Sequence, residues 1–244
     1  MITSDAWLAG IFGRAVFRVD VSAGAGRVAA DAVRADARAR AAAFYYAKVD
    51  TADVATVREL GTAGFSVVDV NVTLDRPPAP APEPSRDIDV ADIRADQHDA
   101  VLDIAGRAFR YSRFHLDPMI PTALAHRVKR EWIESYLAGR RGERLLVATR
   151  DGRAVGFLAV LVTQAQGKVA RVIDLVATAP EAQGLGVGTA LVGGFVRAAG
   201  PGSDVLRVGT QVANAPSIRL YSRMGFQVAR STYVMHAHVG EALS

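Results

Sequence analysis

The sequence predicts an α/β protein in which helices cover a mixed β-sheet. Short apolar runs typical of strands alternate with longer segments whose apolar residues recur at helical spacing. The dipeptide Asp151-Gly152 between two apolar runs is a β-hairpin signal. A proline-rich segment, residues 76–86, separates a first group of such elements from a second. We therefore expect a small N-terminal α/β domain followed by a larger mixed-sheet domain.

The proline-rich segment sets the expected domain boundaries. Residues 76–86 hold five of the ten prolines of the chain, and proline favours an extended backbone and excludes a helix interior. The predicted domains are residues 1–75 and 87–244, with 76–86 as the linker. The N-terminal domain is near the lower size limit for an independent core, so we expect it to lean on the second domain.

Before the linker, the pattern predicts strand, helix, strand, helix and strand in turn. The expected strands are residues 15–21, 44–49 and 65–74, and the expected helices are residues 26–42 and 52–63. Gly64 stands where a glycine commonly ends a helix.

After the linker, two helices precede three strands, and helices then alternate with strands. The first helix runs from about residue 101 to 109 and the second from 122 to 138, where Trp132 and Tyr136 share the apolar face. Gly139 ends the second helix. The expected strands are 144–149, 154–162 and 169–177, then a helix containing Leu191 and Phe195, strand 204–212, helix 215–224 and strand 226–236.

Composition excludes several classes of protein. The chain has no cysteine, which excludes disulfides, Cys-ligated zinc, iron–sulfur clusters and a cysteine nucleophile. The longest uncharged apolar run, 154–162, is far shorter than the roughly 20 residues of a membrane span. The N-terminal segment lacks the basic start of a signal peptide, and Arg14 and Arg18 interrupt it. We expect a soluble cytoplasmic protein without a membrane partner.

Positive charge is concentrated in the second part of the chain. The net charge is +4; residues 1–86 are neutral, and residues 107–153 carry eleven basic and five acidic residues. Such a surplus is typical of a protein that binds an anionic small ligand or nucleic acid, or of a solvated arginine-rich surface. Without an RNP-like motif or a zinc finger, we expect no nucleic-acid partner.

The most informative motif is QGLGVG at residues 183–188, which lies between a predicted strand and a predicted helix. Glycines allow the backbone to approach a ligand closely, and the following helix N-terminus offers N–H groups that suit a pyrophosphate. The motif lacks the Gly-Lys-Ser/Thr of a P-loop, and Thr189 breaks the Rossmann spacing. A tight strand-to-helix turn is the alternative explanation.

The stretch VATAPEAQGLGVGTALV, residues 176–192, resembles the acetyl-CoA-binding signature of the GCN5-related N-acetyltransferase (GNAT) superfamily. Gln183, Gly186 and Gly188 match that signature. Asn214, Tyr221 and the pair Gly225-Phe226 match a second element of the family. The resemblance covers about residues 87–240 and implies a GNAT fold with the small N-terminal α/β domain added to it.

A narrower resemblance extends over almost the whole chain. The segments at 109–121, 129–133 and 206–214 look like those of the dTDP-fucosamine N-acetyltransferase group, and so do 44–49 and 64–74. This implies as acceptor a nucleotide-linked amino sugar such as dTDP-4-amino-4,6-dideoxygalactose. The loop FRYSRFH, residues 109–115, is alternatively a substrate flap found throughout the superfamily.

The resemblance implies acetyl-CoA as cosubstrate and direct attack of the acceptor amine on the thioester. Val176, Ala177 and Thr178 then lie along the pantetheine, and Asn214 contacts the pantetheine or caps the next helix. Tyr221 is the expected general acid for the departing thiolate, or alternatively a core residue. The implied cofactor-binding residues of the glycine-rich segment are Gln183, Gly184, Leu185, Gly186, Val187, Gly188 and Thr189.

The acceptor side is less defined by the sequence. Asp69, His115, Asp117, Asp174 or water could serve as the general base. The expected substrate-binding residues are Arg113, His115, Asp117 and Gln211, and a guanidinium such as that of Arg113 suits phosphate.

His236 and His238 point to one face of the last strand, as two metal ligands could. The adjoining strand sequence has no carboxylate, so we interpret the pair as an exposed strand end and expect no metal.

Two other functions remain open. One is acetylation of a different amine, in a protein N-terminus, a lysine, a polyamine or an antibiotic, although the basic segment at 107–153 suits a polycation poorly. The other is a non-catalytic acyl-CoA sensor. A homodimer is compatible with the sequence, which does not itself define the oligomeric state.

Overall fold

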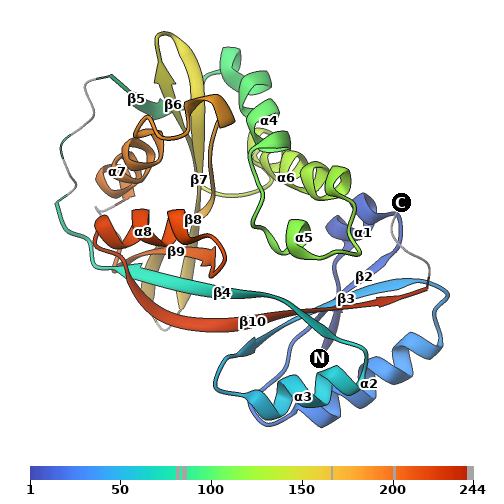
Figure 1. Cartoon of the computed structure of the whole chain (residues 1–244). Coiled ribbons are helices and arrows are strands. Elements are labelled where there is room, and N and C mark those ends of the chain that lie inside the picture. Colours follow the sequence, from blue (N-terminus) through green and yellow to red (C-terminus); the bar gives the residue numbers. More distant parts are fainter. Residues whose placement is uncertain (81–82, 84–86, 166, 200–201, 241–244) are drawn as a thin grey trace.

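The computed structural model describes residues 1–80, 83, 87–165, 167–199 and 202–240. Its described strands form one ten-stranded sheet in the order β1-β2-β3-β10-β4-β9-β8-β7-β6-β5, with helices packed on both faces (Figure 1). Neighbouring strands are antiparallel except for two parallel pairs, β2 with β3 and β8 with β9. The predicted α/β class with a mixed sheet is therefore confirmed.

The strands are β1 (Ile2–Ser4), β2 (Ala15–Val19), β3 (Ala43–Asp50), β4 (Ser66–Arg76), β5 (Asp89–Asp92), β6 (Arg144–Arg150), β7 (Arg153–Ala165), β8 (Lys168–Thr178), β9 (Val205–Gln211) and β10 (Gln227–Val239). The helices are α1 (Ala6–Phe12), α2 (Gly26–Arg38), α3 (Val54–Thr62), α4 (His98–Arg107), α5 (Arg113–Leu116), α6 (Thr122–Leu137), α7 (Val187–Ala199) and α8 (Ala215–Arg223). Two 3-10 turns, η1 (Ala95–Gln97) and η2 (Pro180–Ala182), precede α4 and follow β8. None of the helices in the described part of the chain is long and apolar enough to cross a membrane.

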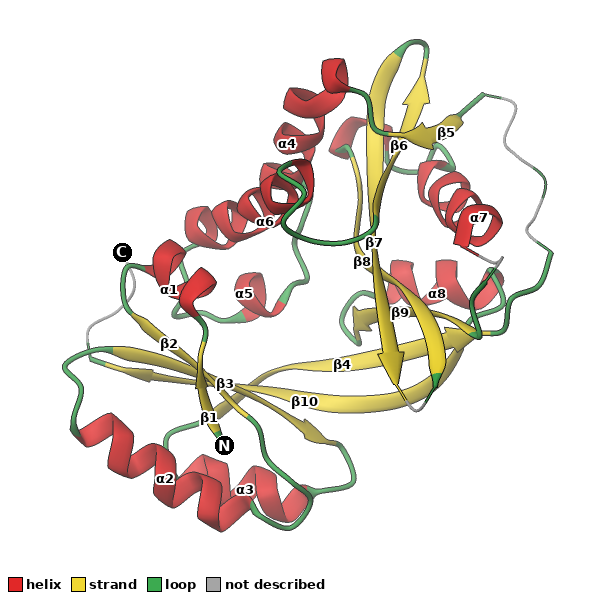
Figure 2. Cartoon of the chain, turned by 180° about the vertical axis from the view of Figure 1, so that it is seen from behind, coloured by secondary structure: helices red, strands yellow, loops and turns green. Residues whose placement is uncertain are grey.

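Strand β3 is buried on both faces over residues 43–47, because its alternate residues meet different helices. Tyr45, Ala47 and Val49 belong to the core formed with α2 and α3. Phe44, with Tyr46 at its edge, belongs to a second core formed with α1, α5 and α6. Figure 2 shows α2 and α3 on one side of these strands and α1 and α5 on the other. The face that carries Phe44 and Tyr46 is the one that leads to the candidate site.

Strands β4 and β10 join the two parts of the sheet. They pair with each other over nearly their whole lengths, and β4 also pairs with β9 while β10 pairs with β3. The two long strands run side by side in both views (Figures 1 and 2). A strand from the first 80 residues is thus inserted between two strands from the last 40. The division into domains at 76–86 stays a prediction, and residues 81–82 and 84–86 lie outside the described residues.

The largest core lies on either side of β6, β7 and β8. Helices α4 and α6 cover one face, and α7 covers the other. Leu191 and Phe195, which the sequence places on the apolar face of α7, are fully buried there. This packing fixes the start of α7 against the sheet and so positions the glycine-rich segment that precedes it.

The structure contains elements that sequence periodicity misses. Strands β1 and β5, together with helices α1 and α5, span only three to seven residues each, too short for a periodic pattern to develop. Helix α2 also ends at Arg38, earlier than predicted, because alanine and arginine continue past its last turn and give no stop signal.

Candidate functional site

The glycine-rich segment lies between β8 and α7. Gly184 and Gly186 have φ angles of 81° and 83°, in the left-handed region that favours glycine. A Cβ at either position would meet nothing within 4 Å, so the backbone conformation, not crowding, requires glycine. Helix α7 begins at Val187, and its first N–H groups have no carbonyl one turn earlier to donate to. Such a helix start is suited to an anionic group.

Strands β8 and β9 pair only near their beginnings. Residues 170–173 pair with 205–208, and beyond them β8 pairs with β7 alone and β9 with β4 alone. A bulge at Asp174 interrupts the pairing of β8 with β7 at this point and changes the course of the strand. Val176, Ala177 and Thr178 therefore have backbone groups that face no strand on the β9 side. These are the residues expected to lie along the pantetheine.

Helix α8 carries two of the predicted residues, Asn214 at its N-terminus and Tyr221 near its C-terminus. The Asn214 side chain accepts a hydrogen bond from the Ser217 N–H at 3.3 Å and so caps α8. Gly188 packs close to Leu220, where an added Cβ would lie 3.1 Å from a methyl carbon. The neighbouring Tyr221 is 2% exposed and its ring contacts Phe226. Burial raises the pKa of Tyr221, so the phenol is protonated at neutral pH.

Among the four predicted candidates for a general base, Asp69 differs from the others. It is buried in β4, where burial raises its pKa to about 6, although hydrogen bonds from the Val70 backbone and the Gln211 side chain oppose this. Its Oδ2 is buried and has no hydrogen-bond partner. A carboxylate of this kind can accept a proton near neutral pH. The contact also places Gln211, an expected substrate-binding residue, beside Asp69.

The other three candidates have different surroundings. Asp174 accepts hydrogen bonds from Trp132, Tyr136 and Arg141 at 2.8–3.1 Å, which occupy both oxygens. His115 Nδ1 lies 2.6 Å from Ser112 Oγ, and burial lowers the pKa of His115 to about 4. Its Nε2 is buried without a partner, but an imidazole with so low a pKa is a weak base.

Asp117 is the centre of a buried hydrogen-bonded cluster. Its Oδ2 lies 2.6 Å from His236 Nδ1 and 2.8 Å from His238 Nε2, and its Oδ1 accepts from the Met119 N–H. Burial alone would raise the pKa of Asp117, but the hydrogen bonds from the two histidines lower it. The interpretation of His236 and His238 as an exposed strand end is wrong, because both side chains are buried. Tertiary packing supplies the carboxylate that the neighbouring strand sequence lacks.

This cluster has the composition of a possible metal site, since the three donor atoms lie within 4.8 Å of one another. Arg113 indicates how the protons are arranged. Its Nη1 lies 3.1 Å from His236 Nε2, and a guanidinium can only donate. We therefore assign His236 Nε2 as acceptor and Nδ1–H as donor to Asp117. This proton occupies the nitrogen that a metal would need, so the residues fit a hydrogen-bonded cluster better than a metal site.

Arg113 is held on three sides by β10, β3 and its own helix. Besides the contact with His236, its guanidinium lies 4.1 Å from the ring centroid of Tyr46 and 4.3 Å from that of Phe114. Burial lowers the pKa of Arg113 to about 10, which leaves it charged at neutral pH. The residue is a fixed positive charge on the same face of the sheet as Asp69.

The sequence analysis did not identify two lysines that lie near Arg113. Lys129 in α6 is 6% exposed, and its Nζ lies 4.9–5.9 Å from the rings of Phe109, Phe114 and Trp132. Burial lowers the pKa of Lys129 to about 7. Lys48 in β3 lies near Asp69 and Arg113. One signal could have found both, since the sequence has 26 arginines and only three lysines, at 48, 129 and 168.

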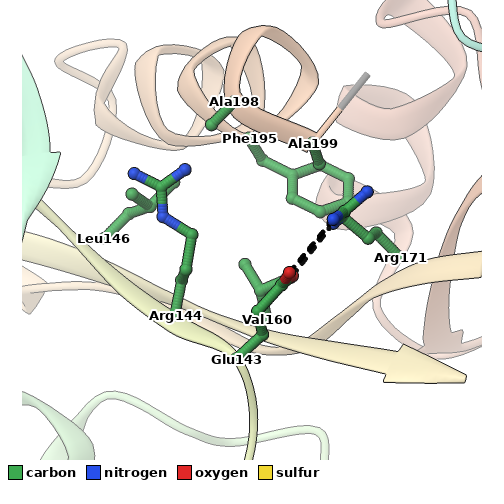
Figure 3. A pocket seen from close by; sticks show the side chains of 8 residues that line it. All are labelled: Glu143, Arg144, Leu146, Val160, Arg171, Phe195, Ala198 and Ala199. Carbon is green, nitrogen blue, oxygen red and sulfur yellow. Dashed lines mark hydrogen bonds and ion pairs between the residues drawn. The ribbon is translucent and has the colours of Figure 1, made fainter. Parts of the chain in front are cut away.

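A small pocket of about 70 Å³ lies elsewhere, between the end of α7 and strands β6 to β8 (Figure 3). Arg171 and Glu143 form an ion pair of 2.9 Å at its edge, and Arg144 pairs with Asp92. None of the residues lining it is one of the predicted site residues. Its charged groups are already paired, so we do not connect it with the site.

The fold, the glycine-rich segment and the parted strands agree with a family comparison. Residues 100–226 match the model of the acetyltransferase (GNAT) family. The chain belongs to this family.

A curated relative is the spore coat polysaccharide biosynthesis protein SpsD of Bacillus subtilis. It is 30% identical over 146 residues, which cover 59% of this chain and 48% of that protein. The chain thus matches about half the length of this relative.

Solved structures support the fold. The GCN5-related N-acetyltransferase from Kribbella flavida has a TM-score of 0.61 at 16% identity, over 91% of this chain and 81% of that one. The one from Sphaerobacter thermophilus has a TM-score of 0.56 at 16% identity, over 84% of this chain and 63% of that one. Both matches thus extend over more than four fifths of this chain.

Proposed function

We propose that this protein transfers the acetyl group of acetyl-CoA to the amine of a nucleotide-linked amino sugar, such as dTDP-4-amino-4,6-dideoxygalactose. The observation that carries the proposal is a single arrangement. A glycine-rich helix start, a parted strand pair, a buried tyrosine and a carboxylate with a free oxygen gather around the ends of β8 and β9.

The acetyl-CoA half of the site is formed by the chain's backbone. The backbone N–H groups of residues 184–189 bind the pyrophosphate, because these groups are donors at the positive end of the α7 dipole. The side chains of Gln183 and Leu185 lie beside the pyrophosphate. The unpaired edge of β8 at 176–178 binds the pantetheine as an added strand would. One of its N–H groups polarises the thioester carbonyl and stabilises the oxyanion that forms there.

On the acceptor side, Asp69 takes up the proton of the substrate ammonium, directly or through one water. Its raised pKa and its partnerless Oδ2 support this role. The free amine then attacks the thioester carbonyl carbon, a C–N bond forms, and the C–S bond breaks. Tyr221 donates its proton to the leaving thiolate, whose conjugate acid has a pKa of about 8.5 by analogy with cysteine. The nitrogen, positively charged after the attack, loses its extra proton to solvent, and the Tyr221 phenolate takes up a proton from solvent. Neither step requires a cysteine, which the chain lacks.

The amino-sugar acceptor is supported by charge and by the relative. Residues 107–153 carry a surplus of six positive charges, which favours an anionic acceptor over a polycation. Arg113 supplies a fixed charge on the face of Asp69, while Gln211 and His115 offer polar contacts. Asp117 acts through its histidines to position Arg113. The relative is named for polysaccharide biosynthesis, which fits an amino sugar better than a peptide.

The test is release of CoA thiol by the purified protein with acetyl-CoA and a panel of dTDP- and UDP-linked 3-amino and 4-amino sugars. A thiol-reactive dye detects only product, because the protein has no cysteine. We expect turnover with a dTDP-linked 4-amino sugar and its loss in Asp69→Asn. Asp89→Asn, on the edge strand β5, is the matched control and should keep full activity.

Other outcomes separate the alternatives. Turnover with polyamines or peptides but not with nucleotide sugars would contradict the acceptor proposed here and leave the transferase chemistry in place. Binding of acetyl-CoA without turnover on any amine would instead favour an acyl-CoA sensor.

A further inference from the structure

Two exposed cations share a face of the sheet with Asp69. They are Lys48 in β3 and Arg230 in β10. Within the described ranges neither one forms an ion pair with a carboxylate, whereas nine other arginines of the second part of the chain, from Arg94 to Arg207, do. Cations without an ion-pair partner on the face that carries Asp69 are available to an anionic ligand.

The strand register places Lys48 and Asp69 in one row. Lys48 is opposite Val234 of β10, and Val234 is opposite Asp69 of β4. Residues directly opposite one another project to the same face, and two strand spacings of about 4.8 Å separate their backbones by roughly 9.5 Å. The amine of Lys48 and the carboxylate of Asp69 therefore lie on one face of the sheet, with strand β10 between them.

Arg230 projects to the same face as Val234, because an even number of residues separates them along β10. The register of β10 against β4 is regular from Arg230 to Val234. The same face carries His236, which contacts Arg113. Lys48 and Arg230 thus share a face with Arg113 and Asp69.

The charges on this face are not balanced. Burial lowers the pKa of Lys48 most, and the positive charges of Arg113 and Arg230 lower it further. Only the negative charge of Asp69 raises it. Asp5 and Asp117 partly balance the charge of Arg113. The repulsion between Lys48 and Arg230 remains, and it costs free energy that a bound anion would recover. Lys48 is exposed at the surface yet partly desolvated, so a ligand can reach it and displace little water.

We propose that Lys48 and Arg230 bind the phosphate groups of the acceptor, so that its diphosphate lies over β3 and β10 while its amine reaches Asp69. This inference rests on the proposed function and adds its substrate-binding residues. A 4-amino hexose carries its amine and its glycosyl phosphate at opposite ends of the ring, as the separation of Asp69 from Lys48 requires. Strand β4 then supplies the base, Asp69, and strand β3 supplies Lys48, which binds the phosphate of the same acceptor.

The first test is binding of dTDP and of UDP, measured by calorimetry on protein saturated with CoA so that the glycine-rich segment is occupied. Lys48→Met and Arg230→Met should each raise the Kd about ten- to hundredfold, since each removes a charged hydrogen bond. Lys48→Arg should stay within about threefold of the unsubstituted protein because it keeps the charge. Lys168→Met, at the exposed β7–β8 hairpin, is the matched control and should bind normally.

The second test is kinetic. In the acetyl-transfer assay, Lys48→Met should raise the KM for the nucleotide sugar and leave the KM for acetyl-CoA unchanged. Equal nucleotide binding by all variants, or no binding of either nucleotide by the unsubstituted protein, would overturn the inference. Nucleotide binding that depends on Lys48 without any turnover would keep this subsite and contradict the proposed function. Turnover on a nucleotide sugar that is indifferent to both substitutions would keep the function and remove the subsite.

Discussion

The buried amine of Lys129 provides the sharpest test of the electrostatics in this structure. Its pKa is about 7 in the folded protein and 10.5 when unperturbed. At about 1.36 kcal/mol per pKa unit, charged Lys129 destabilises the fold by about 4 kcal/mol at pH 7. Fitting a different side chain of similar volume into this site costs up to about 1.5 kcal/mol whatever the pH. Methionine has a similar length and packs well against aromatic rings. Lys129→Met should therefore stabilise the protein by about 2 kcal/mol at pH 7.

The pH dependence of this difference has a definite sign. Between pH 7 and 10.5 the unfolded chain binds the Lys129 proton and the folded protein releases it, so the unsubstituted protein gains stability as pH rises. The advantage of Lys129→Met should shrink by about 2 kcal/mol between pH 7 and pH 9.

The assay is urea unfolding of Lys129→Met, of the unsubstituted protein and of Lys168→Met as control, each at pH 7 and pH 9. At pH 7 the expected gain corresponds to a rise in Tm of about 4–8 °C for a chain of this size. A variant that is less stable at both pH values, or a difference that does not change with pH, would refute the reasoning.

Three further predictions concern the proposed reaction. The pKa of Asp69, raised to about 6, should make kcat/KM fall as pH drops below about 6, and Asp69→Asn should remove this limb and lower kcat/KM about 10²- to 10⁴-fold. Tyr221→Phe should lower kcat with the Kd for acetyl-CoA unchanged, whereas Tyr233→Phe should have no effect; unaltered kcat in the first variant would exclude the general-acid role. Gly186→Val places a β-branched residue at a φ of 83° and should weaken acetyl-CoA binding more than tenfold in a fluorescence titration, so unchanged affinity would contradict the assignment of the glycine-rich segment.

The acetyl-CoA half of the site is local in sequence, and this explains why the sequence could predict it. Residues 176–189 run from strand to glycine-rich turn to helix start without a break. Their function depends on backbone conformation, which glycine determines position by position. The helix that follows has a clear apolar periodicity, so its start could be located closely as well.

The acceptor half depends on residues far apart in the chain. Asp69 meets Gln211, and Asp117 meets His236 at a sequence separation of 119 residues. No periodic pattern encodes such contacts, because they follow from which strands pair. The sequence suggested Asp69 as one base among four, and only burial and the missing partner of its Oδ2 distinguish it.

The sequence by itself determined the fold class, most helices and strands, and the glycine-rich segment that identifies the family. Tertiary structure alone decided that β4 is inserted between β9 and β10, that Lys48 and Asp69 share one row, and that His236 is buried. Local propensities and periodicity act over a few residues. Strand order, burial and charge balance are set by the packing of segments more than a hundred residues apart.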